Sequence, residues 1–420
     1  MVSSNGSGFG ALSDLKIIDL TQLLSGPYAT MMLADQGAQV IKVEPPEGEI
    51  CRDAGPFRED DELQQLGGYF HSIGRNKESV VLDLKTPEGK AALIALVRDA
   101  DAIVENFRSG VMDRLGLSYE TLRAINPRLV YGSLRGFGDS RTGASPYADW
   151  PAFDVVAQAM GGLIAITGPD AATPTKVGPG VGDIVPGMFL AFGVLAAIHH
   201  ARATGVGQFV DVAMADAILA ICERTVWQNS VLGLVPGPEG NHHPFFCPFG
   251  VFPAKDGFVT IATMGDNFFK ILCESLDVPR LLADKRFASE ASRAKNKLDL
   301  ITEVTAITTS LSKLELKEKL GGRIPFSLIM DISEIINDPH FAAREMIVES
   351  EHPGGAPVRI AGVPIKMTET PGGVRRRSPF LGENTITRLR EAGLSDAEIE
   401  AVMRARSATR KSALAKEPVQ

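Results

Sequence analysis

A carboxylate flanked by glycine and proline is the feature of this sequence best suited to chemistry. Asp183 follows the stretch Gly178–Gly182 (GPGVG) and precedes an apolar run, Met188–Ile198. An aspartate at the start of a helix meets free backbone N–H groups and the positive end of the helix dipole, which favour its ionised form. An ionised carboxylate can attack an activated acyl group, and glycines let a bulky substrate approach. Helix capping accounts for the same residue without chemistry and is the commoner role, so the spacing leaves both open.

A second carboxylate, Asp154, precedes another apolar segment that contains Gly161 and Gly162. Capping again explains such a residue. A supporting role beside Asp183 is the alternative.

Cationic side chains stand near the ends of two expected strands. Arg75 and Lys77 come before one, and Arg108 and Arg114 follow another. Such charges can hold the phosphates of an anionic ligand, although solvated surface charge is the default explanation. The run Arg375–Arg377 lies among glycine and proline residues, and we interpret it as a solvated loop.

The elements that must position these residues alternate between strand and helix. Short β-type runs are predicted at 16–21, 39–44, 79–84, 101–105, 129–134 and 207–213. Helices are predicted between them, including 26–35, 87–98 and 118–126, and a final helix at 395–406. This alternation is typical of a parallel α/β sheet, whose ligands bind beyond the carboxyl ends of the strands. The predicted ligand rim is therefore 23–27, 106–110 and 135–138.

Composition argues against several classes of function. The 420 residues are 44% hydrophobic and 22% charged, with a formal net charge of -8, which disfavours a general nucleic-acid or anionic-membrane binder. The four cysteines are far apart and the histidines lack metal-ligand spacing, so we expect neither a disulfide framework nor a metal. The start lacks the pattern of a signal peptide, and the run Met188–Ile198 is too short for a membrane span and predicts a buried helix. The expected location is the cytoplasm.

Three common catalytic or nucleotide-binding motifs are absent from the sequence. The sequence has no Gly-x-Gly-x-x-Gly after its first predicted strand, no Walker loop and no Gly-x-Ser-x-Gly elbow. Nicotinamide, nucleoside-triphosphate and serine-hydrolase chemistry therefore lack their usual sites.

Six stretches, in order, resemble the class III coenzyme A (CoA) transferases. They are DLTQLLSGPYATMMLADQGAQVIKVE, GRNKESVVLDLKTPEGK, DAIVENFRSGVMDRLGL, INPRLVYGSLRGFG, VGDIVPGMFLAFGVLAAIHH and DPHFAAREMIVESEHP. The resemblance covers nearly the whole chain. The family includes formyl-CoA:oxalate transferases, dicarboxylate CoA-transferases and 2-methylacyl-CoA racemases.

The resemblance implies roles for particular residues. Asp183 matches the catalytic aspartate of the family, and Asp154 matches a position where relatives carry Glu or Asp. The implied CoA-binding residues are Leu24, Ser25, Arg75, Asn76, Lys77, Asn106, Phe107, Arg108 and Arg114.

An architecture is implied too. It is an α/β fold with a large Rossmann-like domain, a parallel sheet and a smaller α+β domain, assembled as an interlocked homodimer. The expected boundaries are a flexible tail at 1–10, the large domain at 11–225, the small domain at 226–335, a return to the large domain at 336–406 and a flexible tail at 407–420.

Three departures narrow the expected reaction. Phe153 stands where racemases carry a histidine, and a phenyl ring cannot move a proton. Leu24 replaces a glutamine of the oxalate enzymes, and 237–243 (GPEGNHH) replaces their glycine-rich flap. We expect transfer of CoA from succinyl-CoA to a C4–C5 dicarboxylic or hydroxy acid. The alternatives are an acyl-CoA racemase or epimerase, a formyl-CoA:oxalate transferase and a non-catalytic CoA-binding protein.

The implied mechanism uses Asp183 as the nucleophile. It passes through a mixed anhydride and an aspartyl-CoA thioester, and acyl-CoA and a carboxylic acid are the substrates, with no tightly bound cofactor. Backbone N–H groups of 180–182 are expected to stabilise the oxyanion.

Overall fold

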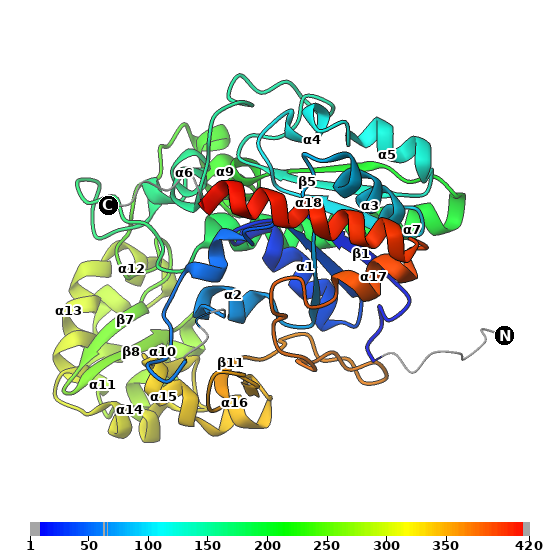
Figure 1. Ribbon diagram of the computed structural model, residues 1–420. Helices are drawn as coiled ribbons and strands as arrows, with labels where there is room; N and C mark the ends of the chain where they lie inside the picture. The colour runs from blue at the N-terminus through cyan, green and yellow to red at the C-terminus, as the bar shows by residue number, and fades with distance from the viewer. Residues whose placement is uncertain (1–8, 62–63, 65, 415–420) are drawn as a thin grey trace. The chain divides into compact units, whose positions relative to one another are not determined.

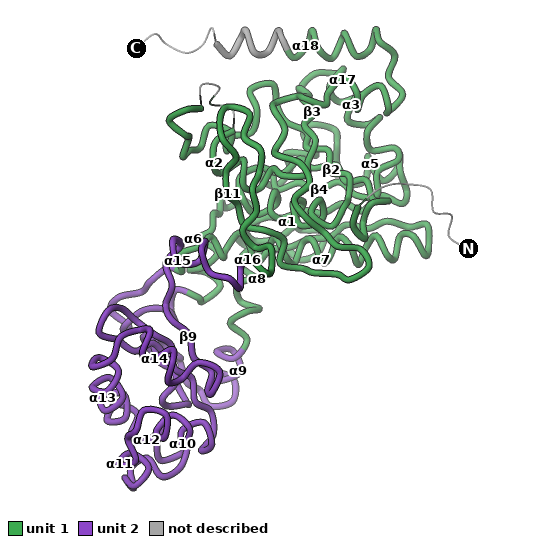
Figure 2. Tube along the Cα trace, turned by 90° about the horizontal axis from the view of Figure 1, so that it is seen from below, with its two compact units in different colours: residues 1–163, 177–223, 342–420 green, residues 164–176, 224–341 purple. Residues whose placement is uncertain are grey.

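The computed structural model describes residues 9–61, 64 and 66–414, with side chains to residue 406. The chain forms two compact units (Figure 2). Unit 1 contains the described residues of 1–163, 177–223 and 342–420. Unit 2 contains 164–176 and 224–341.

Unit 1 is built on a parallel sheet of six strands, which confirms the predicted α/β class. The strands are β1 (Lys16–Asp19), β2 (Gln39–Glu44), β3 (Lys77–Val81), β4 (Ala102–Glu105), β5 (Val130–Arg135) and β6 (Phe209–Ala213). Their order is β3-β2-β1-β4-β5-β6, with every pair parallel. This is the doubly wound order of Rossmann-like sheets, in which the switch point lies between β1 and β4.

Helices cover both faces of this sheet (Figure 1). Neighbouring residues of β1 point to opposite sides: Ile17 packs with α1 (Ser25–Asp35) and α7 (Val181–Thr204), whereas Ile18 packs with α3 (Pro87–Val97) and the C-terminal helices. Because side chains alternate along a strand, a strand covered on both faces carries apolar residues at consecutive positions, as Ile17 and Ile18 do here.

The remaining helices of unit 1 are short, apart from the last. They are α2 (Gly68–Ile73), α4 (Val111–Arg114), α5 (Tyr119–Ile125), α6 (Asp154–Met160), α8 (Met214–Ile221), α16 (Pro339–Ala343, which begins in unit 2), α17 (Thr385–Glu391) and α18 (Asp396–Leu414), with a 3-10 turn at Ile50–Asp53. A hairpin of β10 (Ile347–Ser350) and β11 (Val358–Ala361) belongs to the same unit. Helix α18 continues to Leu414, eight residues past the predicted end at 406, and 415–420 lie outside the described residues.

Helix α7 is longer than its most apolar run suggested. It has 24 residues, and among the described residues it is the one helix long and apolar enough to cross a membrane by length and composition. The expectation that this segment is too short to span was therefore wrong about its length. One side is buried against α1 and the sheet, through Leu190 and Val194. A Cβ at Gly187 would lie 2.5 Å from the Ser25 carbonyl oxygen, so glycine lets α7 approach α1 closely.

Unit 2 is α+β. Its antiparallel sheet has the order β7-β8-β9, with β7 (Phe249–Ala254), β8 (Gly257–Ala262) and β9 (Phe326–Leu328). Its helices are α9 (Glu223–Leu232, which begins at the last residue of a unit 1 segment), α10 (Asp266–Ser275), α11 (Pro279–Ala283), α12 (Glu290–Lys295), α13 (Lys297–Thr308), α14 (Lys313–Leu320) and α15 (Ile332–Asn337), with 3-10 turns at Ile164–Ile166 and Lys285–Phe287. Phe252, Val259 and Ile261 of the sheet are fully buried in its own core.

The carboxyl edge of the large sheet carries buried charges. Asp19, Glu44, Glu105 and Arg135 are the last residues of β1, β2, β4 and β5, and each is buried. A charge is buried only where partners compensate it, so this edge is a built polar layer. It is also the edge at which open α/β sheets bind their ligands.

Candidate active site

A cavity of about 580 Å³ opens at the carboxyl edge of the sheet in unit 1. Its lining includes side chains from all three predicted rim segments and from the first turn of α7. Its lining includes Gln22, Leu23, Ser25, Tyr69, Asn106, Phe107, Arg108, Arg114, Arg135, Trp150, Phe153 and Asp183. Predicted residues far apart in the sequence therefore share one cavity large enough for a sizeable small-molecule ligand.

Asp183 occupies the first turn of α7, as its sequence context predicted. Burial raises the pKa of its carboxyl group to about 7, and the nearby charge of Asp154 contributes in the same direction. A carboxylate of this basicity is a stronger nucleophile than one at an ordinary pKa, and near neutral pH a large fraction of it is ionised.

Asp154 begins α6 and is hydrogen-bonded to the segment that precedes Asp183. Its Oδ1 atom accepts the backbone N–H of Gly182 at 2.7 Å. Both of its carboxylate oxygens accept from Gln158 Nε2 at 2.9 Å. The carboxylate is thus held by donors on two sides, one of them an N–H group in the first turn of α7.

The backbone around Gly182 is not free to stabilise an oxyanion. The Gly182 N–H is bonded to Asp154, and the Val181 N–H is bonded to the Pro179 carbonyl at 2.8 Å. The prediction that the N–H groups of 180–182 stabilise the oxyanion is therefore wrong for Val181 and Gly182. Sequence spacing shows that N–H groups exist at a helix start, but only coordinates show which are already used.

The loop after β1 approaches the cavity in a strained conformation. Leu23 has a φ of +66°, and its N–H donates to Glu49 Oε1 at 2.9 Å. The Asn106 side chain binds the backbone of Gln22, the residue before Leu23. Its Oδ1 atom accepts the Gln22 N–H and its Nδ2 atom donates to the Gln22 carbonyl oxygen, both at 2.8 Å. Strained backbone held by such bonds is typical of functional loops. Leu24 itself packs beside Gly180.

Two guanidinium groups stand at this cavity without a carboxylate partner among the described residues, Arg108 and Arg114. The turn that carries Arg108 is fixed by the Phe107 N–H, which donates to Glu105 Oε2 at 2.7 Å. Arg135 also lines the cavity, but Glu105 and Asp139 neutralise it. Arg108 and Arg114 are therefore the groups available to a polyanionic ligand.

Arg75, Asn76 and Lys77 are placed differently from the predicted CoA-binding residues that line the Asp183 cavity. Lys77 Nζ lies 3.0 Å from Asp19 Oδ2, and both side chains are fully buried. Burial by itself would raise the pKa of Asp19, but the ammonium groups of Lys77 and Lys42 outweigh it and lower the pKa to about 2.

The other two side chains of this group are bonded within the fold as well. Arg75 pairs with Asp35 at 2.7 Å, and Asn76 bonds to Asp35 and to the backbone of 373–376. None of the three lines the described cavity around Asp183. The prediction that they bind CoA stays a prediction.

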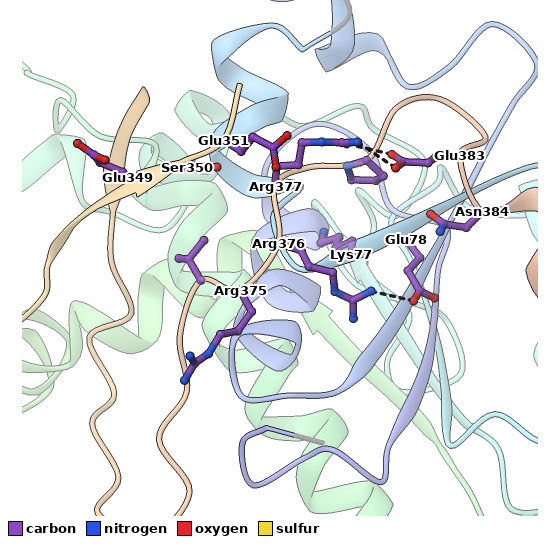
Figure 3. Close-up of a pocket in the computed structure, with 12 residues that line it drawn as sticks. Lys77, Glu78, Glu349, Ser350, Glu351, Arg375, Arg376, Arg377, Glu383 and Asn384 are labelled. Atoms are coloured by element: carbon purple, nitrogen blue, oxygen red, sulfur yellow. Dashed lines mark hydrogen bonds and ion pairs between the residues drawn. The ribbon is translucent and has the colours of Figure 1, made fainter. Parts of the chain in front are cut away.

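A second cavity of about 320 Å³ lies in unit 1, lined by Lys77 and by the Arg375–Arg377 run (Figure 3). Figure 3 shows Arg376 paired with Glu78 and Arg377 paired with Glu383. The nitrogen–oxygen distances of these two ion pairs are 3.1 and 2.9 Å. The run is therefore partly paired rather than simply solvated. The lining has four cationic side chains and four carboxylates, so its formal charges cancel and it does not favour an anion as Arg108 and Arg114 do.

Some residues of the site were missed in the sequence. Tyr69 on α2 lines the Asp183 cavity, and burial raises its pKa to about 12, with smaller contributions from Cys51 and Asp183, so its phenol remains a hydrogen-bond donor. Trp150 is 61% exposed there and packs on Tyr147, with ring centroids 4.7 Å apart. Neither lies in a strand-end pattern, and the Gly67-Gly68 pair before Tyr69 does not indicate a ligand site, so only tertiary structure brings the two side chains to the cavity.

Comparison with known proteins places these features in a family. A family profile described as CoA-transferase family III matches residues 12–385. A succinyl-CoA:mesaconate CoA-transferase of Haloarcula hispanica is 46% identical, with 92% of this chain and 97% of the relative covered. A succinate–glutarate CoA-transferase of Agrobacterium fabrum is 38% identical, with 90% and 95% covered. The crystal structure of a CAIB/BAIF family protein from Brucella suis is similar with a TM-score of 0.81 and 33% identity, covering 91% of this chain and all of that one (100%). The chain therefore belongs to CoA-transferase family III.

Proposed function

We propose that this CoA-transferase moves CoA from succinyl-CoA to a C4–C5 dicarboxylic or hydroxy acid, with Asp183 as the nucleophile. The observation that carries the proposal is that Asp183 shares a cavity with the unpaired guanidinium groups of Arg108 and Arg114. Phosphates bind such groups, which would direct the thioester end of CoA towards the carboxylate. The names of the two relatives described above, which give succinyl-CoA with mesaconate and succinate with glutarate, support the choice of acids.

The proposed reaction begins when an Asp183 carboxylate oxygen attacks the thioester carbonyl carbon. The C–S bond breaks, CoA leaves as its thiolate, and a mixed anhydride of Asp183 and the donor acid remains. The thiolate then attacks the Asp183 acyl carbon, which releases the donor carboxylate and leaves an aspartyl-CoA thioester. An acceptor carboxylate attacks this thioester, and the same steps in reverse form acceptor-CoA and restore Asp183. The apolar lining from Leu23, Phe107 and Phe153 helps exclude water from these acyl intermediates.

Ser25, Asn106 and Phe107 also line the cavity, and we propose that they complete the CoA site together with the two arginines. Asp154 is proposed to support Asp183 through the bond to Gly182. Phe153 lies in the same cavity and offers no proton, which disfavours racemisation.

The decisive experiment combines a substrate panel with mass spectrometry. Purified enzyme is incubated with succinyl-, acetyl- and formyl-CoA against mesaconate, glutarate, citramalate and oxalate, and products are separated by chromatography. Rapid quenching and peptide mapping are expected to show CoA on the peptide containing Asp183. Asp183→Asn should lose the adduct, whereas Asp216→Asn, at the matching first-turn position of α8, should keep it. Transfer without an Asp183 adduct would exclude the mechanism, and α-carbon deuterium exchange without acceptor acid would indicate a racemase. Binding of CoA with neither transfer nor exchange would indicate a non-catalytic protein.

We also propose that the active form is an interlocked homodimer in the cytoplasm. Apolar side chains remain on the surface of α7 in unit 1, including Phe192 at 73% exposure and Met188 at 47%. Exposed apolar patches commonly mark association surfaces. Light scattering should give twice the chain mass, and two differently tagged dimers should not exchange subunits without unfolding. A fully active monomer, or rapid exchange, would refute this assembly, and recovery of the protein in the membrane fraction would refute the location.

A further inference from the structure

We infer that Gln158 is a positioning residue for the Asp183 reaction, because its amide holds the Asp154 carboxylate against the Gly182 N–H. This inference rests on the proposed function and adds a residue to its site. Gln158 lies one helical turn after Asp154 on α6, and it is completely buried.

The orientation of the amide follows from its partners. Gln158 Oε1 accepts the Val177 N–H at 2.9 Å, and a backbone N–H can only donate. Nε2 must therefore face Asp154, where it reaches both oxygens at 2.9 Å. The side chain has one acceptor and one donor group, and both are used.

These bonds connect α6 to both ends of the segment that leads into Asp183. Gln158 binds the segment at Val177, and Asp154 binds it at Gly182. Between these two points the chain is rich in glycine and lies outside regular structure until α7 begins. A segment with so little internal structure takes its position from such external bonds. Gln158 therefore sets both the place of the nucleophile and the closeness of the Asp154 charge to it.

The test uses Gln158→Leu and Gln158→Glu. Leucine removes all the hydrogen bonds, whereas glutamate keeps the size and the acceptor for Val177 but repels Asp154. The matched control is Asn126→Leu: Asn126 is a buried amide that donates to Val97 and Ala100 and accepts from Arg128 N–H, and it does not line the Asp183 cavity. The melting temperature of each variant measures its loss of stability. The value for Asn126→Leu gives the loss expected from removing a buried amide outside the site.

Steady-state kinetics on the full-length enzyme separate positioning from stability. Both Gln158 variants should lose about 10- to 100-fold in kcat, with KM for the acyl-CoA within about threefold, because misplacement of a reacting group lowers the chemical rate. Asn126→Leu should lose stability while its kcat stays within about twofold of wild type.

The pH profile gives a second readout that a merely structural role would not move. Among the described residues, the titratable side chains that interact with Asp183 are Asp154 on α6 and Tyr69 on α2, and Tyr69 stays protonated because its pKa is about 12. If Gln158→Leu lets Asp154 turn away, Asp183 ionises more readily, and the acid limb of the rate profile moves to lower pH.

Two outcomes overturn the inference in different ways. A wild-type enzyme that transfers CoA while Gln158→Leu and Gln158→Glu keep wild-type kcat would refute the role of Gln158 and leave the proposed function intact. A wild-type enzyme that transfers CoA between no pair of acids would refute the proposed function, and the inference with it. If Gln158→Leu does not fold, Gln158→Glu alone decides, since it preserves the side-chain volume.

Discussion

The Asp154 carboxylate accepts a hydrogen bond of 2.7 Å from the backbone N–H of Gly182, the residue immediately before Asp183. The two acidic residues are therefore linked through one peptide group. A Cβ at Gly182 would lie 2.3 Å from the Asp154 carbonyl oxygen and 2.9 Å from its Oδ1. Only glycine fits at position 182, because any side chain there would collide with Asp154.

Gly182→Ala should therefore displace Asp154, the loop or both. We expect kcat to fall about 100-fold, because small displacements of a reacting group have effects of that size. Gly178→Ala is the control, since a Cβ at Gly178 meets no atom within 4 Å. It should leave kcat within about twofold of wild type. Stopped-time assays of product formation measure both, and equal activities of the two variants would show that the close contact does not matter.

Asp183→Asn should abolish transfer yet stabilise the protein at neutral pH. The pKa of Asp183 is about 7 in the folded state and near the ordinary aspartate pKa of 3.8 when unfolded, so between these pH values the folded state holds the extra proton. The free energy of unfolding therefore falls as pH rises from about 4 to 7, and above about pH 7 this group causes no further fall. Asparagine carries no such charge, and the gain is at most about 4 kcal/mol at about 1.4 kcal/mol per pKa unit.

Denaturant unfolding at pH 8 and pH 4 measures this gain. The variant should exceed wild type at pH 8 and match it at pH 4. For the wild-type enzyme the rate should fall below about pH 7, as the Asp183 nucleophile becomes protonated. A gain at pH 4 as large as that at pH 8 would contradict the titration as its cause.

Arg108→Ala and Arg114→Ala should weaken binding of acyl-CoA rather than the chemical step. Each removes a charge-assisted contact worth about 1.5–3 kcal/mol, so KM for acyl-CoA should rise by about 10- to 100-fold with kcat little changed. Arg98→Ala, an exposed arginine of the same unit outside the Asp183 cavity, is the control. Titration calorimetry with CoA gives the same comparison without turnover, and unchanged affinity in both variants would remove these arginines from the CoA site.

Lys77→Met tests whether a residue matched to the CoA site acts through the fold. Its ammonium group is fully buried against Asp19, so its loss removes the ion-pair partner of a buried carboxylate and should cost about 3–5 kcal/mol of unfolding free energy. Lys85→Met, at an exposed position, should change stability by less than about 0.5 kcal/mol. A Lys77→Met protein with normal stability and a raised KM for acyl-CoA would instead support direct CoA binding by the side chain.

The sheet and its helices could be predicted because each element carries a local pattern. Strand β2 was expected at 39–44 and is observed at those residues, and the Thr86 cap with Pro87 marks the start of α3. We could predict that the strands pair in parallel because helices lie between them in the sequence. The end of α18 was misplaced because its last turns lack an apolar pattern, so periodicity could not show that the helix continues.

The sequence by itself determined the class of fold, the family resemblance and Asp183 as the residue of greatest interest. Local patterning and a glycine-rich helix start are properties of adjacent residues, and they can be read without knowing what packs where. Only tertiary structure decided that Gln158 donates to Asp154, that Asp154 accepts the Gly182 N–H, and that Tyr69 and Trp150 reach the cavity. It also decided that Lys77 faces Asp19 inside the fold. Whether a polar group meets a ligand or a buried partner depends on contacts between distant segments, and no spacing along the chain encodes that choice.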